Sequence, residues 1–219
     1  MNSIKSLETS WLLDRSAVIL AGGFSSRFGQ DKGLIELAGK PLVRYVLDAI
    51  KKIVDEKLVI VSSEDQAKKY SEIFDSSLKI FVDKNKVQTP LVGALTGFRE
   101  AKGKYTLLLP CDTPFMSKEI LSLLFEICIG KNAVIPRWPN GYIEPLQAVY
   151  CTKPALDAAE KALADASFNM RSLVDRLRGV RYVSTMVLQQ LDPELRTFFN
   201  VNTPLDLKKA EFMLKHKKR

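Results

Sequence analysis

Residues 19–32 read Ile-Leu-Ala-Gly-Gly-Phe-Ser-Ser-Arg-Phe-Gly-Gln-Asp-Lys. An apolar run, residues 17–21, is typical of a buried strand and stops at the pair Gly22–Gly23. Glycine lets backbone N–H groups face an anion because no side chain stands in the way. Arg27 offers a planar fork to phosphate oxygens, and Lys32 offers a mobile positive charge. The stretch therefore predicts a loop that wraps a nucleotide triphosphate at the carboxyl end of a strand.

The spacing of this loop excludes two common nucleotide-binding motifs. A Walker loop needs Gly-Lys-Ser/Thr after its second glycine, whereas Gly29 is followed by Gln30. The dinucleotide fingerprint G-x-G-x-x-G is not formed either. A plain glycine turn with solvated charges is the other interpretation, and the joint presence of Arg27, Asp31 and Lys32 argues against it.

Composition narrows the class of protein. A chain of 219 residues suits one sizeable α/β domain. The net charge of +8 favours anionic ligands such as nucleotides, phosphorylated metabolites or nucleic acid. No run approaches the roughly 18 apolar residues of a membrane span. Residues 1–15 contain Lys5, Glu8, Asp14 and Arg15, so they form no apolar secretion signal.

Cysteine and histidine usage restricts the chemistry. The three cysteines, Cys111, Cys128 and Cys151, are widely spaced, which argues against a disulfide framework and a thiolate zinc site. We therefore expect a reducing, cytoplasmic location. The single histidine, His216, lies among lysines near the end of the chain, so a buried histidine base is not expected. Carboxylates, lysine, arginine and bound metal remain as catalytic groups.

Strand-like and helix-like segments alternate along the chain. This pattern predicts an α/β fold: a single Rossmann-like domain with three α/β/α layers and a mostly parallel, partly mixed central sheet. The expected strands are 17–21, 57–61, 78–82, 105–109, 132–136, 146–150 and 181–184. The expected helices are 41–54, 64–74, 91–101, 118–129, a helical region over 153–178, and a final helix that Thr203 caps.

The expected organisation has three parts: an N-terminal extension at 1–15, the nucleotide-binding domain at 16–207, and a basic tail at 208–219. The tail carries the charges Lys208, Lys209, Lys215, Lys217, Lys218 and Arg219. A basic end of this kind is usually a solvated helix face with a frayed terminus. Nucleic-acid binding would need supporting aromatic residues or a recognised module, and we do not expect it.

Two aspartates follow expected strands. Asp112 comes just after the buried run 105–109, where ligands bind beside the carboxyl ends of strands in open α/β sheets. A carboxylate at this place suits Mg²⁺, which takes few protein ligands and bridges phosphate oxygens. Asp83 follows strand 78–82 in the same way. A turn or capping role remains open for both side chains.

Asn200 and Asn202 stand two residues apart in an extended segment, so both side chains point to one side. Amide side chains donate and accept hydrogen bonds, which suits a ring edge or a phosphate. The neighbouring Thr203-Pro204 pair is typical of a helix start. For the two asparagines, a ligand role and a structural role both remain open.

Four motif blocks between residues 17 and 207 resemble the molybdenum cofactor guanylyltransferase family. The loop is similar to L-A-G-G-x-S-x-R-M-G-x-D-K, with Phe28 in place of methionine. Residues 110–114 match P-C-D-x-P, and residues 200–207 match N-x-N-T-P-x-D-L. Residues 89–93 are similar to G-P-L-x-G, but Thr89 replaces the first glycine. Residues 145–150 also resemble the family's P-L-x-A-x-Y strand, to which we assign no catalysis.

The resemblance implies a nucleotidyltransferase fold and the transfer of GMP from GTP to the phosphate of molybdopterin. It implies catalytic roles for Arg27, Lys32 and Asp112, with Mg²⁺ on Asp112. The GTP-binding residues that it implies are Leu20, Ala21, Gly22, Gly23, Lys32, Asp83, Gly93 and Asp112. It further implies pterin contacts from Asn200 and Asn202, and transient contact with cofactor-insertion proteins or molybdoenzymes.

Two alternatives remain open at this level. A related nucleotidyltransferase would use CTP or another nucleotide, on molybdopterin or on another phosphorylated small molecule, because loop contacts that the sequence does not resolve choose the base. A non-catalytic regulator that binds a nucleotide or nucleic acid is the more distant alternative. The presence of Arg27, Lys32 and Asp112 speaks against lost catalysis.

Overall fold

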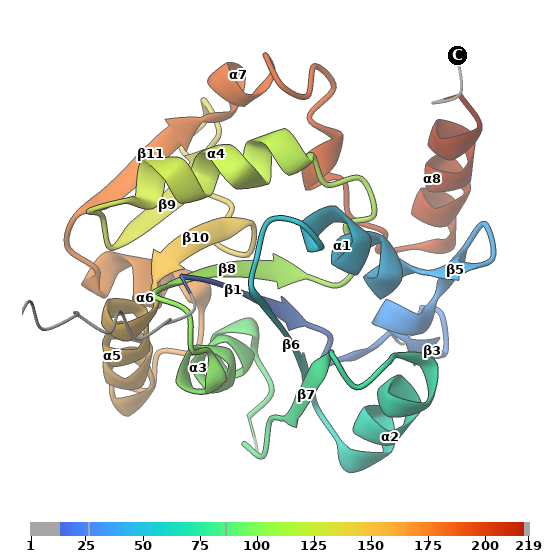
Figure 1. The fold of residues 1–219 in the computed structure, drawn as a ribbon, viewed down its shortest axis with the longest axis horizontal. Coiled ribbons are helices and arrows are strands. Elements are labelled where there is room, and N and C mark those ends of the chain that lie inside the picture. Colours follow the sequence, from blue (N-terminus) through green and yellow to red (C-terminus); the bar gives the residue numbers. More distant parts are fainter. Residues whose placement is uncertain (1–13, 26, 86, 217–219) are drawn as a thin grey trace, which may run out of the picture.

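The computed structural model describes residues 14–25, 27–85 and 87–216. A seven-stranded sheet with the order β11-β9-β10-β8-β1-β6-β7 forms its centre (Figure 1). Strand β10 runs antiparallel to β8 and β9, and the other neighbouring strands are parallel. The predicted mostly parallel, mixed sheet is therefore confirmed. The strands are β1 (Arg15–Leu20), β6 (Glu56–Val61), β7 (Lys79–Val82), β8 (Tyr105–Pro110), β9 (Ala133–Arg137), β10 (Ala148–Cys151) and β11 (Val180–Ser184).

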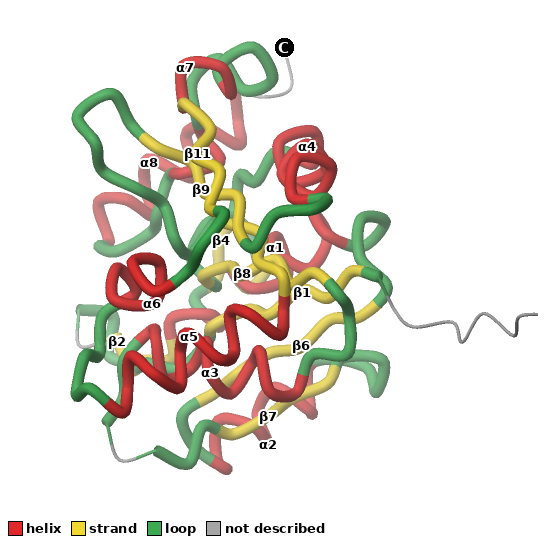
Figure 2. Tube along the Cα trace, turned by 90° about the vertical axis from the view of Figure 1, so that its left-hand side faces the viewer, coloured by secondary structure: helices red, strands yellow, loops and turns green. Residues whose placement is uncertain are grey.

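Helices cover both faces of this sheet, because successive side chains of a strand point to opposite faces. Ala17 and Ile19 pack on one side with α1 (Leu42–Ile50), α2 (Glu64–Ile73) and α4 (Lys118–Cys128). Val18 packs on the other side with α3 (Pro90–Glu100), α5 (Thr152–Ala164) and α6 (Met170–Arg176). Figure 2 shows α3 and α5 side by side on that second face. The expected three-layer arrangement is confirmed.

Two of the expected helical segments differ from the structure by more than one residue, and local chemistry explains the larger difference. The helical region expected over 153–178 is two helices, α5 and α6. Ala166 between them has φ 53°, a left-handed conformation that a continuing helix cannot contain. Asn169 then caps α6, its side chain accepting a hydrogen bond from the Ser172 N–H at 3.0 Å. The helix expected over 41–54 is shorter, since α1 ends at Ile50.

Several short elements were not predicted, because elements of two to four residues are too short to show a periodic pattern. They are the hairpin of β2 (Phe24–Ser25) with β3 (Gln30–Asp31), the hairpin of β4 (Glu36–Leu37) with β5 (Lys40–Pro41), the 3₁₀ turns at Lys32–Leu34 and Arg196–Phe198, and α7 (Thr185–Leu188). A third apolar cluster joins the β4–β5 hairpin to α8 (Pro204–His216) through Ile35, Leu37, Val201 and Ala210. Because Val201 belongs to it, this cluster packs the segment before α8 against the β4–β5 hairpin.

The expected segment boundaries fall inside regular elements. Strand β1 already begins at Arg15, and α8 runs through the expected boundary at residue 208. Residues 1–13 of the expected extension, and residues 217–219 of the expected tail, lie outside the described residues.

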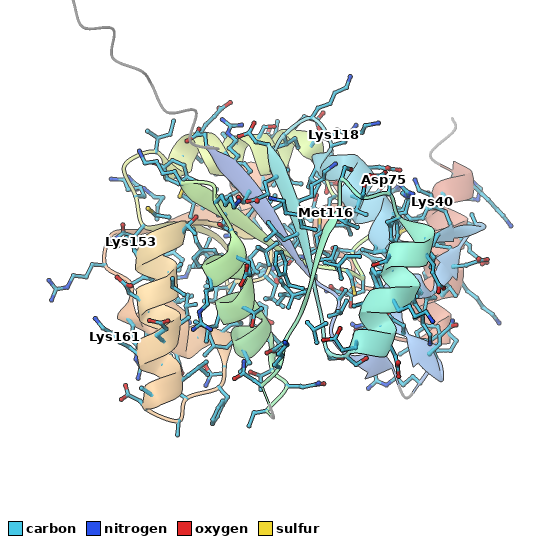
Figure 3. The ribbon with its side chains drawn as sticks, turned by 60° about the horizontal axis from the view of Figure 1, so that its bottom comes forward. Lys40, Asp75, Met116, Lys118, Lys153 and Lys161 are labelled. Atoms are coloured by element: carbon cyan, nitrogen blue, oxygen red, sulfur yellow. The ribbon has the colours of Figure 1, made fainter. Side chains whose placement is uncertain are left out.

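Figure 3 shows Lys153 and Lys161 on the outer side of α5, both exposed, while Met116 is buried between elements. Within the described parts of the chain, no helix is long and apolar enough to cross a bilayer.

Glu56 is a buried carboxylate at the first residue of β6. It accepts hydrogen bonds from the Ser16 hydroxyl at 2.7 Å, the Lys102 N–H at 2.8 Å and the Lys79 ammonium at 2.5 Å. Burial alone would raise the pKa of Glu56, but these three donors outweigh it, and the pKa lies below its ordinary value. The side chain thus ties β1, β6 and β7 together at the edge opposite their carboxyl ends.

We expect Glu56→Gln to lower the free energy of unfolding by about 1–2 kcal/mol at neutral pH, because one charge-assisted pair is lost and Lys79 is half-exposed. The folded-state pKa is depressed, so this contribution is present above the ordinary value of about 4.3 and is lost as the pH falls through the folded-state pKa. Urea denaturation of both proteins from neutral pH to about pH 3 measures this. Glu72→Gln, at an exposed position of α2, is the matched control. A Glu56→Gln deficit that stays constant on acidification would contradict the assignment.

Candidate active site

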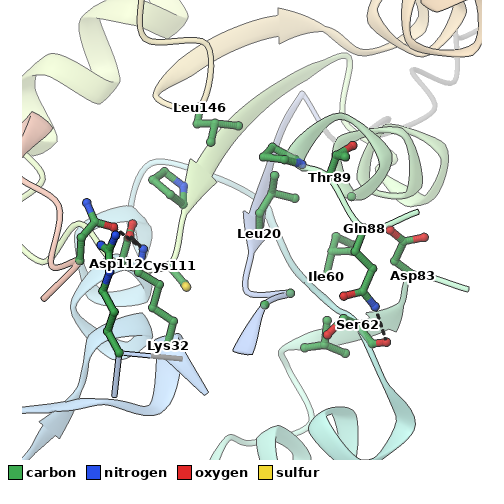
Figure 4. Close-up of a pocket in the computed structure, with 18 residues that line it drawn as sticks. Leu20, Lys32, Ile60, Ser62, Asp83, Gln88, Thr89, Cys111, Asp112 and Leu146 are labelled. Atoms are coloured by element: carbon green, nitrogen blue, oxygen red, sulfur yellow. Dashed lines mark hydrogen bonds and ion pairs between the residues drawn. The ribbon is translucent and has the colours of Figure 1, made fainter. Parts of the chain in front are cut away.

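A pocket of about 630 Å³ opens at the carboxyl ends of β1, β6, β7 and β8 (Figure 4). The chain leaves β1 toward β6 and reaches β8 on the other side of β1, so this is a point where the strand order reverses. Open α/β sheets bind ligands at such points. The pocket is lined by Leu20, Gly22, Gly23, Arg27, Lys32, Ile60, Val61, Ser62, Asp83, Gln88, Thr89, Pro90, Gly93, Pro110, Cys111, Asp112, Leu146 and Asn202.

The glycine loop forms one wall of the pocket. Gly23 has φ 137°, which an L side chain rarely adopts, so glycine is required there. A Cβ on Gly22 would come within 3.5 Å of the Ser62 backbone nitrogen, so the loop passes close to the end of β6. The loop then returns through the β2–β3 hairpin into the turn that carries Lys32. Gly22 and Gly23 thus both line the pocket, where neither carries a side chain.

Lys32 and Asp112 form an ion pair inside the pocket, between the ammonium and Oδ2 (Figure 4). The same ammonium donates a hydrogen bond to Asn202 Oδ1 at 2.6 Å. Asp112 is buried, and its Oδ1 has no hydrogen-bond partner among the described residues. The Val201 N–H donates to the Asp112 carbonyl at 2.9 Å, which fixes the segment that carries Asn202 against the loop that follows β8. Three segments distant in sequence thus meet at one ammonium group.

Arg27 lines the same pocket from the glycine loop and is exposed. It makes no ion pair with a residue that the structure describes. The pocket therefore holds one paired cation, Lys32, and one cation that is free to turn toward an anionic ligand. Such a fork binds phosphate oxygens in pairs.

The opposite wall comes from the start of α3 and the end of β7. Gly93 faces Leu20, and a Cβ there would lie 3.3 Å from the Leu20 side chain, so the helix packs closely on β1. Thr89, which replaces a family glycine, caps α3: its hydroxyl accepts from the Val92 N–H at 3.4 Å. Asp83 is buried and accepts from the Asn85 side chain at 2.7 Å. Leu20 and Gly93 form the apolar part of this wall, and Asp83 and Thr89 form its polar part.

Burial raises the pKa of two side chains at or beside the pocket, Cys111 and Tyr70. It raises the pKa of the Cys111 thiol, and the carboxylates Asp112 and Asp31 raise it further. Burial likewise raises the pKa of Tyr70, again with help from Cys111 and Asp31. Cys111 is therefore a neutral thiol and no nucleophile, and the Tyr70 hydroxyl keeps its proton as a donor.

The pocket unites nine of the site residues singled out from the sequence: Leu20, Gly22, Gly23, Arg27, Lys32, Asp83, Gly93, Asp112 and Asn202. It leaves out Ala21 and Asn200. The Ala21 carbonyl accepts a hydrogen bond from Gln66 at 2.8 Å, and the Asn200 amide donates to the Phe198 carbonyl at 3.2 Å. Ser62 and Gln88 were not assigned from the sequence as ligand-binding residues, because single side chains in loops form no recognisable motif. Leu146 belongs to the motif at residues 145–150, to which the sequence analysis gave no catalytic role.

Metal ligands are few at this site. No group of three or more histidine, cysteine or acidic side chains gathers among the described residues. Asp112 nevertheless presents a buried oxygen that lacks a hydrogen-bond partner. A cation that takes one or two carboxylates and obtains its other ligands from phosphate and water fits this donor set.

Comparison with known proteins places the chain in a family. Residues 17–180 match the MobA-like NTP transferase domain. A probable molybdenum cofactor guanylyltransferase of Methanosarcina mazei is 34% identical, over 93% of this chain and 92% of that protein. The molybdenum cofactor guanylyltransferase of Desulfosudis oleivorans is 30% identical, over 91% and 96%. The crystal structure of molybdopterin-guanine dinucleotide biosynthesis protein A from Archaeoglobus fulgidus superposes with a TM-score of 0.78 at 30% identity, over 92% of this chain and 99% of that one. The chain belongs to the MobA-like NTP transferase family and is a nucleotidyltransferase.

The unpartnered oxygen of Asp112 leads to a stability prediction. Asp112→Asn keeps the shape of the side chain and removes a buried charge, while Lys32 is 27% exposed and keeps its bond to Asn202. The lost ion pair and the relieved desolvation oppose each other. We therefore expect the free energy of unfolding without ligand to change by less than about 1 kcal/mol. Thermal and urea denaturation measure this, and a loss of about 3 kcal/mol or more would show that the ion pair stabilises the fold.

Proposed function

We propose that this enzyme transfers GMP from GTP to the phosphate of molybdopterin, which yields the guanine dinucleotide form of the cofactor and pyrophosphate. The names of its relatives support the choice of substrates. The observation that carries the chemistry is the meeting of Lys32, Asp112 and Asn202 in the pocket beside the glycine loop. A cytoplasmic location is part of the proposal, supported by free thiols at Cys111, Cys128 and Cys151.

In this reaction an oxygen of the acceptor phosphate attacks the α-phosphorus of GTP. A new P–O bond forms as the bond from the α-phosphorus to the bridging oxygen breaks, and pyrophosphate leaves with that electron pair. The attacking oxygen is already ionised near neutral pH, so no protein base is needed. This agrees with the position of His216, which packs on Phe212 at the end of α8.

Lys32 and Arg27 have the electrostatic role. As charge builds up on the α-phosphoryl group, a fixed ammonium and a guanidinium stabilise it more than water does, because they need little reorganisation. The ion pair with Asp112 holds the Lys32 ammonium in the pocket before substrate arrives. The open backbone near Leu20, Gly22 and Gly23 is suited to the ribose and base, with Asp83 and Gly93 on the opposite wall.

Asp112 is the residue that we propose for a divalent cation, with Mg²⁺ as the ion. Its buried Oδ1 without a partner supports this assignment. When bound, the cation would supply positive charge to the triphosphate. We propose Asn202 for the acceptor side of the pocket, whereas Asn200 does not line it. Transient partners that deliver or receive the labile cofactor complete the proposal.

The choice of base is the part of the proposal that separates it from its nearest alternative. GTP, CTP, UTP and ATP would each be incubated with Mg²⁺ and molybdopterin, and pyrophosphate release and dinucleotide formation would be measured. We expect release with GTP and little with the other nucleotides. Preferred use of CTP, or transfer only to another phosphorylated acceptor, would overturn the assignment while leaving a nucleotidyltransferase.

We expect Lys32→Ala to lower turnover by roughly 10²–10³, the usual effect of removing one electrostatic donor from a phosphoryl-transfer site. Lys69→Ala, an exposed position of α2, is the control and should keep full turnover. Steady-state kinetics with GTP provide the measurement. Near-normal turnover of Lys32→Ala would remove this lysine from the mechanism.

A further inference from the structure

Gln66 is a buried glutamine in the first turn of α2, outside the pocket lining. Its Nε2 donates to the Ala21 carbonyl at 2.8 Å and also to Asp31 Oδ2. Its Oε1 accepts from the Ser62 N–H at 2.8 Å and from the Ser62 hydroxyl at 3.0 Å. The amide thus faces two acceptors with its nitrogen and two donors with its oxygen, so only this orientation satisfies all four groups.

The four groups belong to three separate segments. Ala21 follows β1 and starts the glycine loop, Ser62 follows β6, and Asp31 ends the hairpin that leads to Lys32. Elsewhere, the Ala21 N–H donates to the Ile60 carbonyl at 2.9 Å, but no other side chain in the described parts of the chain bridges all three. Gln66 therefore fixes where the loop starts and where it returns.

Asp31 connects the position of Gln66 to that of Lys32. Its Oδ1 accepts from the Gly33 N–H at 2.9 Å and from the Tyr70 hydroxyl at 3.1 Å, and its side chain caps the turn that begins at Lys32. The turn is packed against Tyr70: a Cβ on Gly33 would stand 2.1 Å from the Tyr70 oxygen. The backbone on both sides of Lys32 is thus held by Asp31.

We propose that Gln66 is a positioning residue of the phosphate-binding loop: acting through Asp31, it sets the place of the Lys32 ammonium in the pocket. The inference rests on the proposed function, because it assigns to the loop the binding of a triphosphate. Gln66 does not itself line the pocket: it contacts the lining residue Ser62, and its effect on Lys32 runs through the Asp31 cap. Misplacement of a phosphate-binding group by about 1 Å is enough to cost up to about 100-fold in rate.

Replacing the amide nitrogen of Gln66 by oxygen distinguishes a positioning role from a general contribution to stability. Gln66→Glu keeps size and shape, but puts a carboxylate oxygen against Asp31 Oδ2 and the Ala21 carbonyl. Two carboxylates that share one site repel, and one of them binds a proton at a raised pKa. Asp31 is the titratable group that faces this position, and Tyr70 on α2 and Cys111 after β8 lie near Asp31 in turn. Glu64 and Asp65 stand on the same turn of α2 and are exposed.

The experiment measures the affinity of the full chain for inorganic tripolyphosphate with Mg²⁺ by titration calorimetry, and kcat/KM with GTP, from about pH 5 to pH 8. Gln66→Glu, Gln66→Met and the double variant Gln66→Glu with Asp31→Asn are compared with wild type. Gln190→Glu, an exposed position after α7 with the same charge change, is the control. Near-UV circular dichroism and thermal denaturation report the fold of each variant.

We expect Gln66→Glu to lower both quantities roughly 10–100-fold near neutral pH and to recover part of the loss at acid pH, relative to wild type. Gln66→Met should show a similar loss at every pH. The double variant should recover part of the affinity at neutral pH, because the new amide donates to the new carboxylate while the Ala21 carbonyl still lacks its donor. Gln190→Glu should match wild type.

Tripolyphosphate affinity of Gln66→Met equal to that of wild type would overturn the inference, even if Gln66→Glu did not fold. A folded Gln66→Glu whose loss neither depends on pH nor responds to Asp31→Asn would also overturn it. Absence of GMP transfer by the wild-type chain would instead contradict the proposed function. In that case the tripolyphosphate measurements still report on the position of the loop.

Discussion

The ion pair between Lys32 and Asp112 is the interaction on which the site depends. It joins the glycine loop after β1 to the loop after β8, and its ammonium also holds Asn202 from the segment before α8. These elements come from the beginning, middle and end of the chain, and only the folded sheet brings them together. Taking a carboxylate out of water costs free energy that an ion pair offsets only in part, so this pair is weak evidence for a stabilising role. Asp112 Oδ1, which is buried and has no hydrogen-bond partner among the described residues, favours a role in binding a ligand.

The fold places a satisfied, stabilising cluster and the polar groups of the pocket at opposite edges of the sheet. Glu56 joins the strands at the edge opposite the pocket, where three donors satisfy a buried carboxylate fully. At the carboxyl edge, in contrast, polar groups such as Arg27 and Asp112 Oδ1 are left available in a pocket. Gln66 combines both features: its four hydrogen bonds are all satisfied, and they hold the loop that carries Lys32.

The sequence predicted the sheet, its flanking helices and half of the residues that line the pocket, because these depend on local patterns. Position 23 needs glycine because its φ is positive, and Asp112 follows an apolar strand whose end lies at the sheet edge. It did not predict the short hairpins or the break between α5 and α6, which rest on single residues such as Ala166. Period-two spacing suggested that Asn200 and Asn202 act together, but the Asn200 amide turns to its own backbone neighbour, the Phe198 carbonyl. Gln66 was not singled out, since a glutamine in a helix has many possible partners until the packing is known.

A crystal structure of the chain with Mg²⁺ and a GTP analogue that cannot be cleaved between the α- and β-phosphates tests the central claim most directly. We expect the triphosphate in the pocket, with the Lys32 ammonium and the Arg27 guanidinium on its oxygens and the metal on Asp112 Oδ1. A triphosphate bound elsewhere, or one bound here with Lys32 still paired only to Asp112 and Asn202, would contradict the proposed chemistry.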